Sequence, residues 1–323
     1  MKHSVGTQQG KAQISFALIV VINFIVSSII ITGIVFGIKG YVSDTKATYE
    51  SITCCRSICS NCIFTLYTFT TVLPWVCVVI FFIGIGLAIY KTFFLLFWNY
   101  RFIRSLPSIS IENHPKLKSI ANSAHVYHQL ILLDSNELRS AFTLGLLKPK
   151  VYLSLGICSY LTEKEILAVI LHEIHHKKNK DPLKLFVIQI LYALNFFLPV
   201  NHYLLNQFSS ASEKAADDNA IYFSKEPLEL ASALVKLCKS NRVAKLHLLA
   251  LSFKGQNIVE DRIRRLLEPQ IASPCFAKTS LYSSCLLSFF IAVILCLSLI
   301  CKFFTPAHPG DCKTKTCHMV KCG

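Results

Sequence analysis

Three long apolar stretches constrain this chain more than any other feature, because each is long enough to cross a lipid bilayer. Residues 14–38 run for 25 positions without a charged side chain, and residues 281–301 are also uncharged. Residues 71–98 contain a single charged residue, Lys91. A transmembrane helix needs about 20 consecutive, mostly apolar residues. With 53% hydrophobic and 16% charged residues overall, the composition excludes a single water-soluble domain. We therefore predict a mainly α-helical membrane protein with about three transmembrane helices.

Basic residues near the ends of these stretches predict the orientation. Lys2 and Lys11 precede the first span, and Arg101 and Arg104 follow the second. Because positive residues next to spans stay on the cytoplasmic side, we expect a multi-pass protein of the bacterial plasma membrane whose N-terminus and main domain face the cytoplasm. The predicted parts are an N-terminal membrane region at 1–98 with an outer loop at 39–70, a domain at 99–280, a transmembrane helix at 281–301 and an outer tail at 302–323.

The cysteines give independent support for this orientation. Seven of the 14 cysteines crowd into the two predicted outer segments, namely Cys54, Cys55, Cys59, Cys62, Cys312, Cys317 and Cys322. Disulfides persist outside the cytoplasm, so we expect disulfides here, with metal binding as the alternative. Seven is an odd number, so one thiol would stay free, pair with Cys301 or bridge two chains. The pairing does not follow from the sequence.

The pentapeptide from His172 to His176 reads His-Glu-Ile-His-His and has the spacing of a zinc-peptidase motif. Thr162 and Glu165 form a capping box just upstream, which predicts that the motif lies on a helix. Two histidines four positions apart then project from one helix face. Glu173 lies about 100° around the helix from His172, free to act on a water molecule. A chance match in a histidine-rich helix end is the alternative.

A catalytic zinc ion takes three protein ligands and keeps one position open, so a third ligand is required. Downstream, Glu213 and Asp217 lie four residues apart and would share a helix face. Glu213 is the predicted third ligand for one zinc ion per chain. Asp217 is placed to accept a hydrogen bond from the free N–H of a ligand histidine. An exposed polar helix face is the alternative, and Asp218 is expected to be solvated.

The segment between the two halves of this motif poses a geometric problem. Residues 183–205 are apolar enough for a fourth span, yet a single crossing would place Glu213 across the bilayer from His172. We predict instead a helical hairpin, with Asp181 as the N-cap of its first helix and Pro199 in the interruption between the two helices. The tip of this hairpin would dip into the membrane or pack beside the spans.

Residues 140–145 and 150–154 are predicted to form two short strands around a turn. If one of them is an edge strand beside the catalytic helix, it would bind an extended substrate by strand addition. The residues for this contact are Ser140, Ala141, Phe142 and Thr143. An ordinary hairpin that covers the core is the alternative.

Together these motifs resemble a known family of membrane proteases. The two strands, the His172 motif, Asp181-Pro182 and the Glu213 motif follow the order seen in membrane gluzincins. The chain looks most like the antirepressor peptidases of bacterial β-lactam-sensor receptors (BlaR/MecR-like), and is more distantly similar to the heat-shock and prenyl-protein membrane zinc proteases. The resemblance covers residues 100–225 and implies a cytoplasmic α+β gluzincin domain with a small sheet.

By this resemblance His172, His176 and Glu213 would bind zinc, Glu173 would be the general base, and Asp217 would support a ligand histidine. Two departures stand out. The sensor receptors carry a penicillin-binding domain after the last span, and only residues 302–323 follow it here, so we expect that sensor domain to be lacking. Ser140 stands where the heat-shock relatives have asparagine, which puts the usual substrate contact of that side chain in doubt.

The predicted function is zinc-dependent hydrolysis of peptide bonds in regulatory or signalling proteolysis, with a zinc-activated water and Glu173 as the base. A separate oxyanion donor is expected; His175, His202 and Tyr203 are the nearest candidates, and each is interpreted more readily as structural. The alternatives are a membrane signalling receptor with a mainly structural zinc site, and a quality-control protease for membrane proteins. A transporter would need more spans and an ionisable residue inside one.

The formal charge of +15 also raises the question of nucleic-acid binding. The basic residues cluster beside the predicted membrane segments, at 177–184 and at Arg262, Arg264 and Arg265, where anionic lipids explain them. We expect no direct contact with nucleic acid. The predicted partners are the lipid bilayer and a protein substrate, either a transcriptional repressor or the chain itself, and the oligomeric state stays open.

Overall fold

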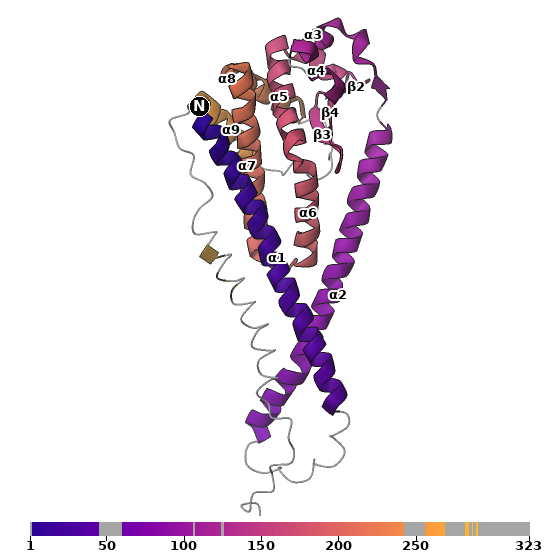
Figure 1. Ribbon diagram of the computed structural model, residues 1–323, viewed down its shortest axis with the longest axis vertical. Coiled ribbons are helices and arrows are strands. Elements are labelled where there is room, and N and C mark those ends of the chain that lie inside the picture. Colours follow the sequence, from indigo (N-terminus) through magenta and orange to yellow (C-terminus); the bar gives the residue numbers. More distant parts are fainter. Residues whose placement is uncertain are drawn as a thin grey trace, which may run out of the picture.

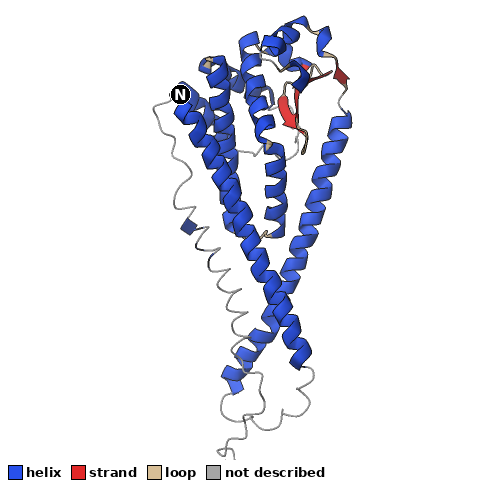
Figure 2. Cartoon of the chain, in the orientation of Figure 1, coloured by secondary structure: helices blue, strands red, loops and turns tan. Residues whose placement is uncertain are grey.

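The computed structural model describes residues 2–44, 60–105, 107–123, 126–241 and 256–268, with the isolated positions 282, 283, 286 and 289. The fold is mainly α-helical with one small sheet, as predicted (Figure 2). Within these residues the helices are α1 (Lys2–Asp44), α2 (Ser60–Ser105), α3 (Pro115–Ser123), α4 (Leu155–Tyr160), α5 (Glu163–Asn179), α6 (Asp181–Leu194), α7 (Pro199–Ser224), α8 (Pro227–Asn241) and α9 (Gln256–Leu267). The strands are β1 (Ser108–Ile109), β2 (Leu130–Leu133), β3 (Ala141–Leu144) and β4 (Lys150–Ser154), and 3-10 turns cover Ile111–Asn113 and Tyr127–Gln129.

Two described helices are long and apolar enough to cross a membrane, over Gly6–Val35 in α1 and Val78–Ser105 in α2. Many of their large side chains point outward, including Phe24 at 72% exposure and Phe93 at 70%, where lipid would solvate them better than water. Figure 1 shows the two helices crossing near one end of the molecule and diverging toward the other. The third predicted span lies almost wholly outside the described residues, as do the outer tail and residues 45–59 of the outer loop.

Helices α6 and α7 form the predicted hairpin, which is therefore confirmed. They fill the space between the diverging ends of α1 and α2, with α7 packed on α1 and α6 on α2 (Figure 1). The contact with α1 is apolar and buried: Ile19 and Phe208 are fully buried in one cluster with other side chains of α7. The chain turns back between Leu194 and Pro199. This reversal brings the far half of α7 to the level of α5.

The hairpin tip is fixed to both long helices by contacts without charge. Asn23 of α1 donates to Oδ1 of Asn201 at 2.8 Å and accepts from the side-chain amides of Asn195 and Asn201 at 2.8 and 3.0 Å. On the other side, α2 approaches so closely that a Cβ atom at Gly84 would lie 2.2 Å from the carbonyl oxygen of Leu194. Only glycine allows that approach.

The sheet lies at the end of the molecule where α1 and α2 are far apart. Its strand order is β1-β2-β4-β3, with β2 parallel to β4 and the other pairs antiparallel. The predicted pair of strands, β3 and β4, is confirmed, and Gly145 follows β3 with φ +112°, a conformation that favours glycine. Strands β1 and β2 were not predicted. Within the described residues β3 pairs only with β4, so it is an edge strand.

Helix α5 is anchored to the sheet and to α8. Its capping box is present as predicted: Glu165 N–H donates to the Thr162 hydroxyl, and the Glu165 carboxylate accepts from Thr162 N–H. The same carboxylate also accepts from Ser232 and Lys236 of α8. Ile166 and Ile170 are buried against the sheet in the main core. The helix that carries the histidine motif is thus held at its first turn and along one face.

Candidate metal centre

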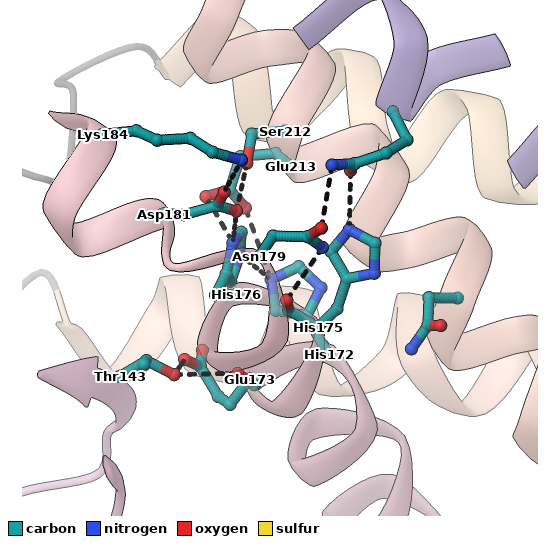
Figure 3. A network of polar contacts seen from close by, with 12 residues as sticks. Thr143, His172, Glu173, His175, His176, Asn179, Asp181, Lys184, Ser212 and Glu213 are labelled. Carbon is teal, nitrogen blue, oxygen red and sulfur yellow. Dashed lines mark hydrogen bonds and ion pairs between the residues drawn. The ribbon is translucent and has the colours of Figure 1, made fainter. Parts of the chain in front are cut away.

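Helices α5 and α7 bring the three predicted ligand side chains together. The Nε2 atoms of His172 and His176 lie 3.2 Å apart, one helical turn from each other. Glu213 of α7 places Oε2 3.4 Å from Nε2 of His172 and Oε1 3.7 Å from Nε2 of His176. Figure 3 shows these side chains converging between the two helices. The hairpin therefore returns Glu213 to the level of the histidines, as its predicted length required.

These separations suit a tetrahedral zinc ion. Ligand atoms about 2.0–2.2 Å from zinc at tetrahedral angles lie roughly 3.3–3.5 Å from one another. The two Nε2 atoms lie 3.2 Å apart, Oε2 of Glu213 lies 3.4 Å from that of His172, and Oε1 lies 3.7 Å from that of His176. With one ligand atom from each residue, all three atoms lie within 4.8 Å of one another. Two imidazoles and one carboxylate are also a donor set that zinc accepts. Within the described residues, His172, His176 and Glu213 form a group that could hold a metal ion.

Each ligand histidine has a carboxylate beside its other ring nitrogen. Nδ1 of His176 lies 2.8 Å from Oδ2 of Asp181, which also accepts from the Ser212 hydroxyl at 2.6 Å (Figure 3). Nδ1 of His172 lies 3.0 Å from Oδ1 of Asp217, although outside the angular range of a hydrogen bond. Carboxylates in this position fix the ring orientation and leave Nε2 for a metal. Asp217 thus lies beside His172, and the hydrogen bond predicted between them is not formed in this structure.

The role of Asp181 was predicted wrongly. It is the first residue of α6, its side chain makes no capping hydrogen bond, and Lys180 at φ 52° occupies the N-cap position. This left-handed residue interrupts the helix between α5 and α6. The side chain of Asp181 lies beside His176 instead of capping its own helix. The sequence signal for this contact is that Asp181 follows His176 by five residues. The Asp-Pro pattern, which is typical of a helix start, favoured the other interpretation.

The site favours positive charge between its carboxylates. Burial alone would lower the pKa of His172, but its polar contacts with Asp217 and Glu213 outweigh burial and raise that pKa to about 10. Burial alone would raise the pKa of Glu213, but the nearby Arg262 guanidinium and the two histidines hold that pKa well below its usual range. The same balance that stabilises a protonated histidine would stabilise a divalent cation.

Glu173 faces the sheet and not the three ligands. The Thr143 hydroxyl of β3 lies 2.8 Å from the carboxylate of Glu173 and 2.9 Å from its carbonyl oxygen (Figure 3). The hydroxyl has one hydrogen for these two acceptors, so it donates to one at a time. Of the four predicted substrate-strand residues, Thr143 thus contacts the predicted base directly. Ser140, Ala141 and Phe142 precede it, and Phe142 stacks on Tyr152 with ring centroids 5.4 Å apart.

Arg262 of α9 is part of this site, and the sequence reasoning missed it. Its guanidinium donates to both carboxylate oxygens of Asp217 at 2.7 and 2.8 Å and lies 2.6 Å from Oε2 of Glu213. The assignment of Arg262 and Arg265 to lipid was wrong, because Arg262 is buried and Arg265 pairs with Asp218. Asp218 is buried as well, not solvated. No local sequence pattern relates Arg262 to Asp217, because the two residues are 45 positions apart.

The three oxyanion candidates lie away from the ligand atoms. Buried His175 contacts Gln9 of α1 through Nε2 at 3.1 Å, so the expectation of a solvated residue was wrong. Its burial, with the nearby positive charge of His176, lowers the pKa of His175 to about 4. His202 contacts Asn206, and the Tyr203 hydroxyl accepts from Gln207, both near the hairpin tip. Tyr203 lies ten residues before Glu213, about 15 Å along α7.

Comparison with known proteins gives a consistent result. Residues 14–266 match the family described as BlaR1 peptidase M56, which covers more than half of the chain. The Regulatory protein BlaR1 of Bacillus licheniformis is 25% identical over 205 residues, which are 61% of this chain and 34% of that protein. The chain thus spans about a third of the length of this relative.

Proposed function

Because this chain belongs to the BlaR1 peptidase M56 family, we propose that it is a zinc-dependent endopeptidase of the membrane that acts in regulatory proteolysis. Peptidases of this family are metallopeptidases. The relative from Bacillus licheniformis is a regulatory protein by name, which supports regulation over general degradation. The two apolar helices support a membrane location, and the basic residues at their ends favour a catalytic end that faces the cytoplasm.

The observation that carries the proposal is the convergence of His172, His176 and Glu213, with Glu173 next to His172 on helix α5. The three side chains come from α5 and α7, and their ligand atoms lie close enough together to hold one metal ion. A zinc ion held there would supply Lewis-acid chemistry, lowering the pKa of water and polarising a peptide carbonyl. Asp181 and Asp217 would keep both imidazoles oriented with Nε2 toward that ion.

Glu173 is the residue we assign to proton transfer. It takes a proton from the water that attacks the scissile carbonyl carbon, and it delivers that proton to the amine nitrogen as the peptide bond breaks. Its carboxylate is half-buried and lies within hydrogen-bond distance of Thr143, which restricts where it points. A base held in one orientation loses less entropy in the reaction than a mobile one.

Strand β3 is the place we assign to the substrate backbone. The backbone of Ser140 bonds toward β4, with its carbonyl accepting from Ser154 N–H at 3.2 Å. Since backbone groups alternate sides along a strand, those of Ala141 and Thr143 face the other edge. In the described part of the chain, no strand occupies that edge. An extended peptide paired there would run past Glu173, which lies beside Thr143.

Replacement of Glu173 by glutamine tests the proposal. We expect the purified Glu173→Gln protein to keep one zinc ion per chain, because Glu173 is not among the ligands. In cells, new protein N-termini that appear with the wild type should disappear with this variant. Glu163→Gln is the matched control, because Glu163 begins the same helix and its side chain is 63% exposed.

Two results would count against the assignment. Loss of zinc together with cleavage would mean that Glu173 holds the site and does not act as the base. Unchanged signalling and cleavage in Glu173→Gln would instead favour a receptor with a structural zinc site. The identity of the cleaved proteins would separate a repressor, the chain itself and misfolded membrane proteins as substrates.

A further inference from the structure

Helix α9 is docked on α7 through charged pairs, and one of these pairs reaches the metal centre. Arg265 pairs with Asp218 and donates to the carbonyl of Lys214, and Asp261 pairs with the side chain of Lys214. These contacts hold the helix but touch none of the ligand side chains. Arg262 differs, because it is buried and its partners are the third predicted ligand and the carboxylate beside the first.

The guanidinium of Arg262 binds two acidic side chains at once. Nε and Nη2 form a two-point contact with Asp217, and Nη1 lies 2.6 Å from Oε2 of Glu213. A planar guanidinium has its donors in a fixed fork, so one arginine sets the relative position of both carboxylates. Lysine could not do the same, because its ammonium group is a single point of charge.

These contacts make the two oxygens of Glu213 unequal. Oε2 lies 2.6 Å from Nη1 of Arg262 and 3.4 Å from Nε2 of His172, whereas Oε1 lies 3.7 Å from Nε2 of His176. Asp217 is held in the same way, since its Oδ1 lies 2.7 Å from Arg262 and 3.0 Å from Nδ1 of His172. Arg262 also offsets the repulsion between the neighbouring carboxylates of Glu213 and Asp217 on one face of α7.

We propose that Arg262 is a positioning residue of the candidate metal centre, which orients the carboxylate of Glu213 toward the two histidines and holds Asp217 against His172. The inference rests on the proposed zinc site but not on proteolysis. Arg262 acts through Glu213 and Asp217 and touches no reacting group.

Metal binding tests this role without any assay of cleavage. The full chain is purified in detergent as wild type, Arg262→Gln, Arg262→Lys and Arg265→Gln. For each, the zinc dissociation constant is measured by competition with a chelator, and the visible spectrum is recorded with cobalt(II) in place of zinc. The cobalt spectrum reports the number and geometry of ligands, which helix docking alone would not change. Thermal unfolding reports stability separately.

We expect Arg262→Gln to weaken zinc binding by about 10–100-fold and to shift the cobalt spectrum, as loss of a residue that orients metal ligands typically does. Arg262→Lys keeps the charge without the fork and should fall between Arg262→Gln and the wild type. Arg265→Gln should lower the unfolding temperature and leave both metal readouts within about threefold of the wild type, since Arg265 contacts no residue of the ligand set.

Three outcomes would overturn the role. Zinc affinity and cobalt spectrum unchanged in Arg262→Gln would show that the guanidinium does not position the ligands. Tighter zinc binding in that variant would show that Arg262 competes with the metal for Glu213. Equal losses in Arg265→Gln and Arg262→Gln would show that only the docking of α9 matters. If Arg262→Gln does not fold, the zinc affinity and cobalt spectrum of Arg262→Lys are compared with those of Arg265→Gln instead. Cleavage lost in Glu173→Gln with normal metal binding would leave this inference intact.

Discussion

The candidate metal centre and the tip of the α6–α7 hairpin are both largely buried polar networks, but they are built from different chemistry. At the centre, histidines, carboxylates and the Arg262 guanidinium carry or exchange charge. At the tip, Asn23, Asn195 and Asn201 are neutral and fully buried beside apolar helices. A buried charge is costly unless it is paired, whereas a neutral amide needs only its hydrogen bonds. The charged side chains therefore lie where α5, α7 and α9 bring groups of opposite charge together.

The two ends of the hairpin differ in what they hold in place. The base positions ligands, because Asp181 begins α6 and Glu213 lies in the far half of α7. The tip fixes the hairpin to α1 and α2 by amide bonds and a close backbone approach. Changes at the base should therefore alter metal binding more than stability. Changes at the tip should do the reverse.

The largest effect is expected at the base, from Asp181→Asn. Loss of this carboxylate frees the His176 ring and removes a negative charge beside it. We expect zinc affinity to fall by about 10–100-fold, equivalent to about 1.4–2.7 kcal/mol. Asp218→Asn is the control, because Asp218 is a buried aspartate that pairs with Arg265 and not with a histidine. Competition with a chelator measures both, and equal loss in the two variants would break the comparison.

At the tip, Gly84→Ala should reduce stability without weakening zinc binding. The new Cβ atom would lie 2.2 Å from the carbonyl oxygen of Leu194, so α2 and the hairpin must move apart. We expect a loss of about 1–3 kcal/mol, seen as a lower unfolding temperature in detergent. Gly86→Ala has open space around it and should be neutral or slightly stabilising. If the two variants unfold alike, the close contact of α2 with the tip is not tight in solution.

A smaller, pH-dependent effect is expected at the start of α5. Burial alone would raise the pKa of Glu165, but hydrogen bonds from Lys236, Ser232 and Thr162 outweigh it and lower that pKa below 4.5. A lowered folded-state pKa stabilises the fold above the unfolded value, and this contribution is lost as the pH falls through the folded value. Lys236→Met should therefore cost about 1 kcal/mol at pH 7 and progressively less below about pH 4.5. Denaturant unfolding at several pH values checks this. A constant difference between wild type and variant at all pH values would show that the ion pair contributes nothing.

Local spacing in the sequence accounts for the side chains that the structure brings together at the candidate metal centre. The capping box, the two histidines and the pair Glu213 and Asp217 each depend on contacts within a few residues of helix. The hairpin followed from a constraint, because a zinc site cannot be split across a bilayer. The return of Glu213 to the level of the histidines also depended on the lengths of the two helices, which follow from the rise per residue.

Long-range pairing is the part that the sequence could not show. Arg262 reaches Asp217 from a helix 45 residues away, and Asn23 reaches Asn195 across 172 residues. A cluster of arginines before an apolar stretch looks like a lipid contact, and an asparagine in a span looks like an isolated polar residue. Only the packing of α9 on α7, and of α1 on the hairpin, turns them into partners. Strand β2 was missed for a similar reason, because its partner β4 lies beyond β3 in the chain.

The most direct test of the metal centre is the zinc content of the purified chain, compared between the wild type and Glu213→Gln. Glutamine preserves the size of the side chain and removes the charge that would bind the metal. We predict one zinc ion per wild-type chain and a large loss of zinc in Glu213→Gln. A wild type without zinc, or a Glu213→Gln protein with its full zinc content, would contradict a site built from both ends of this hairpin.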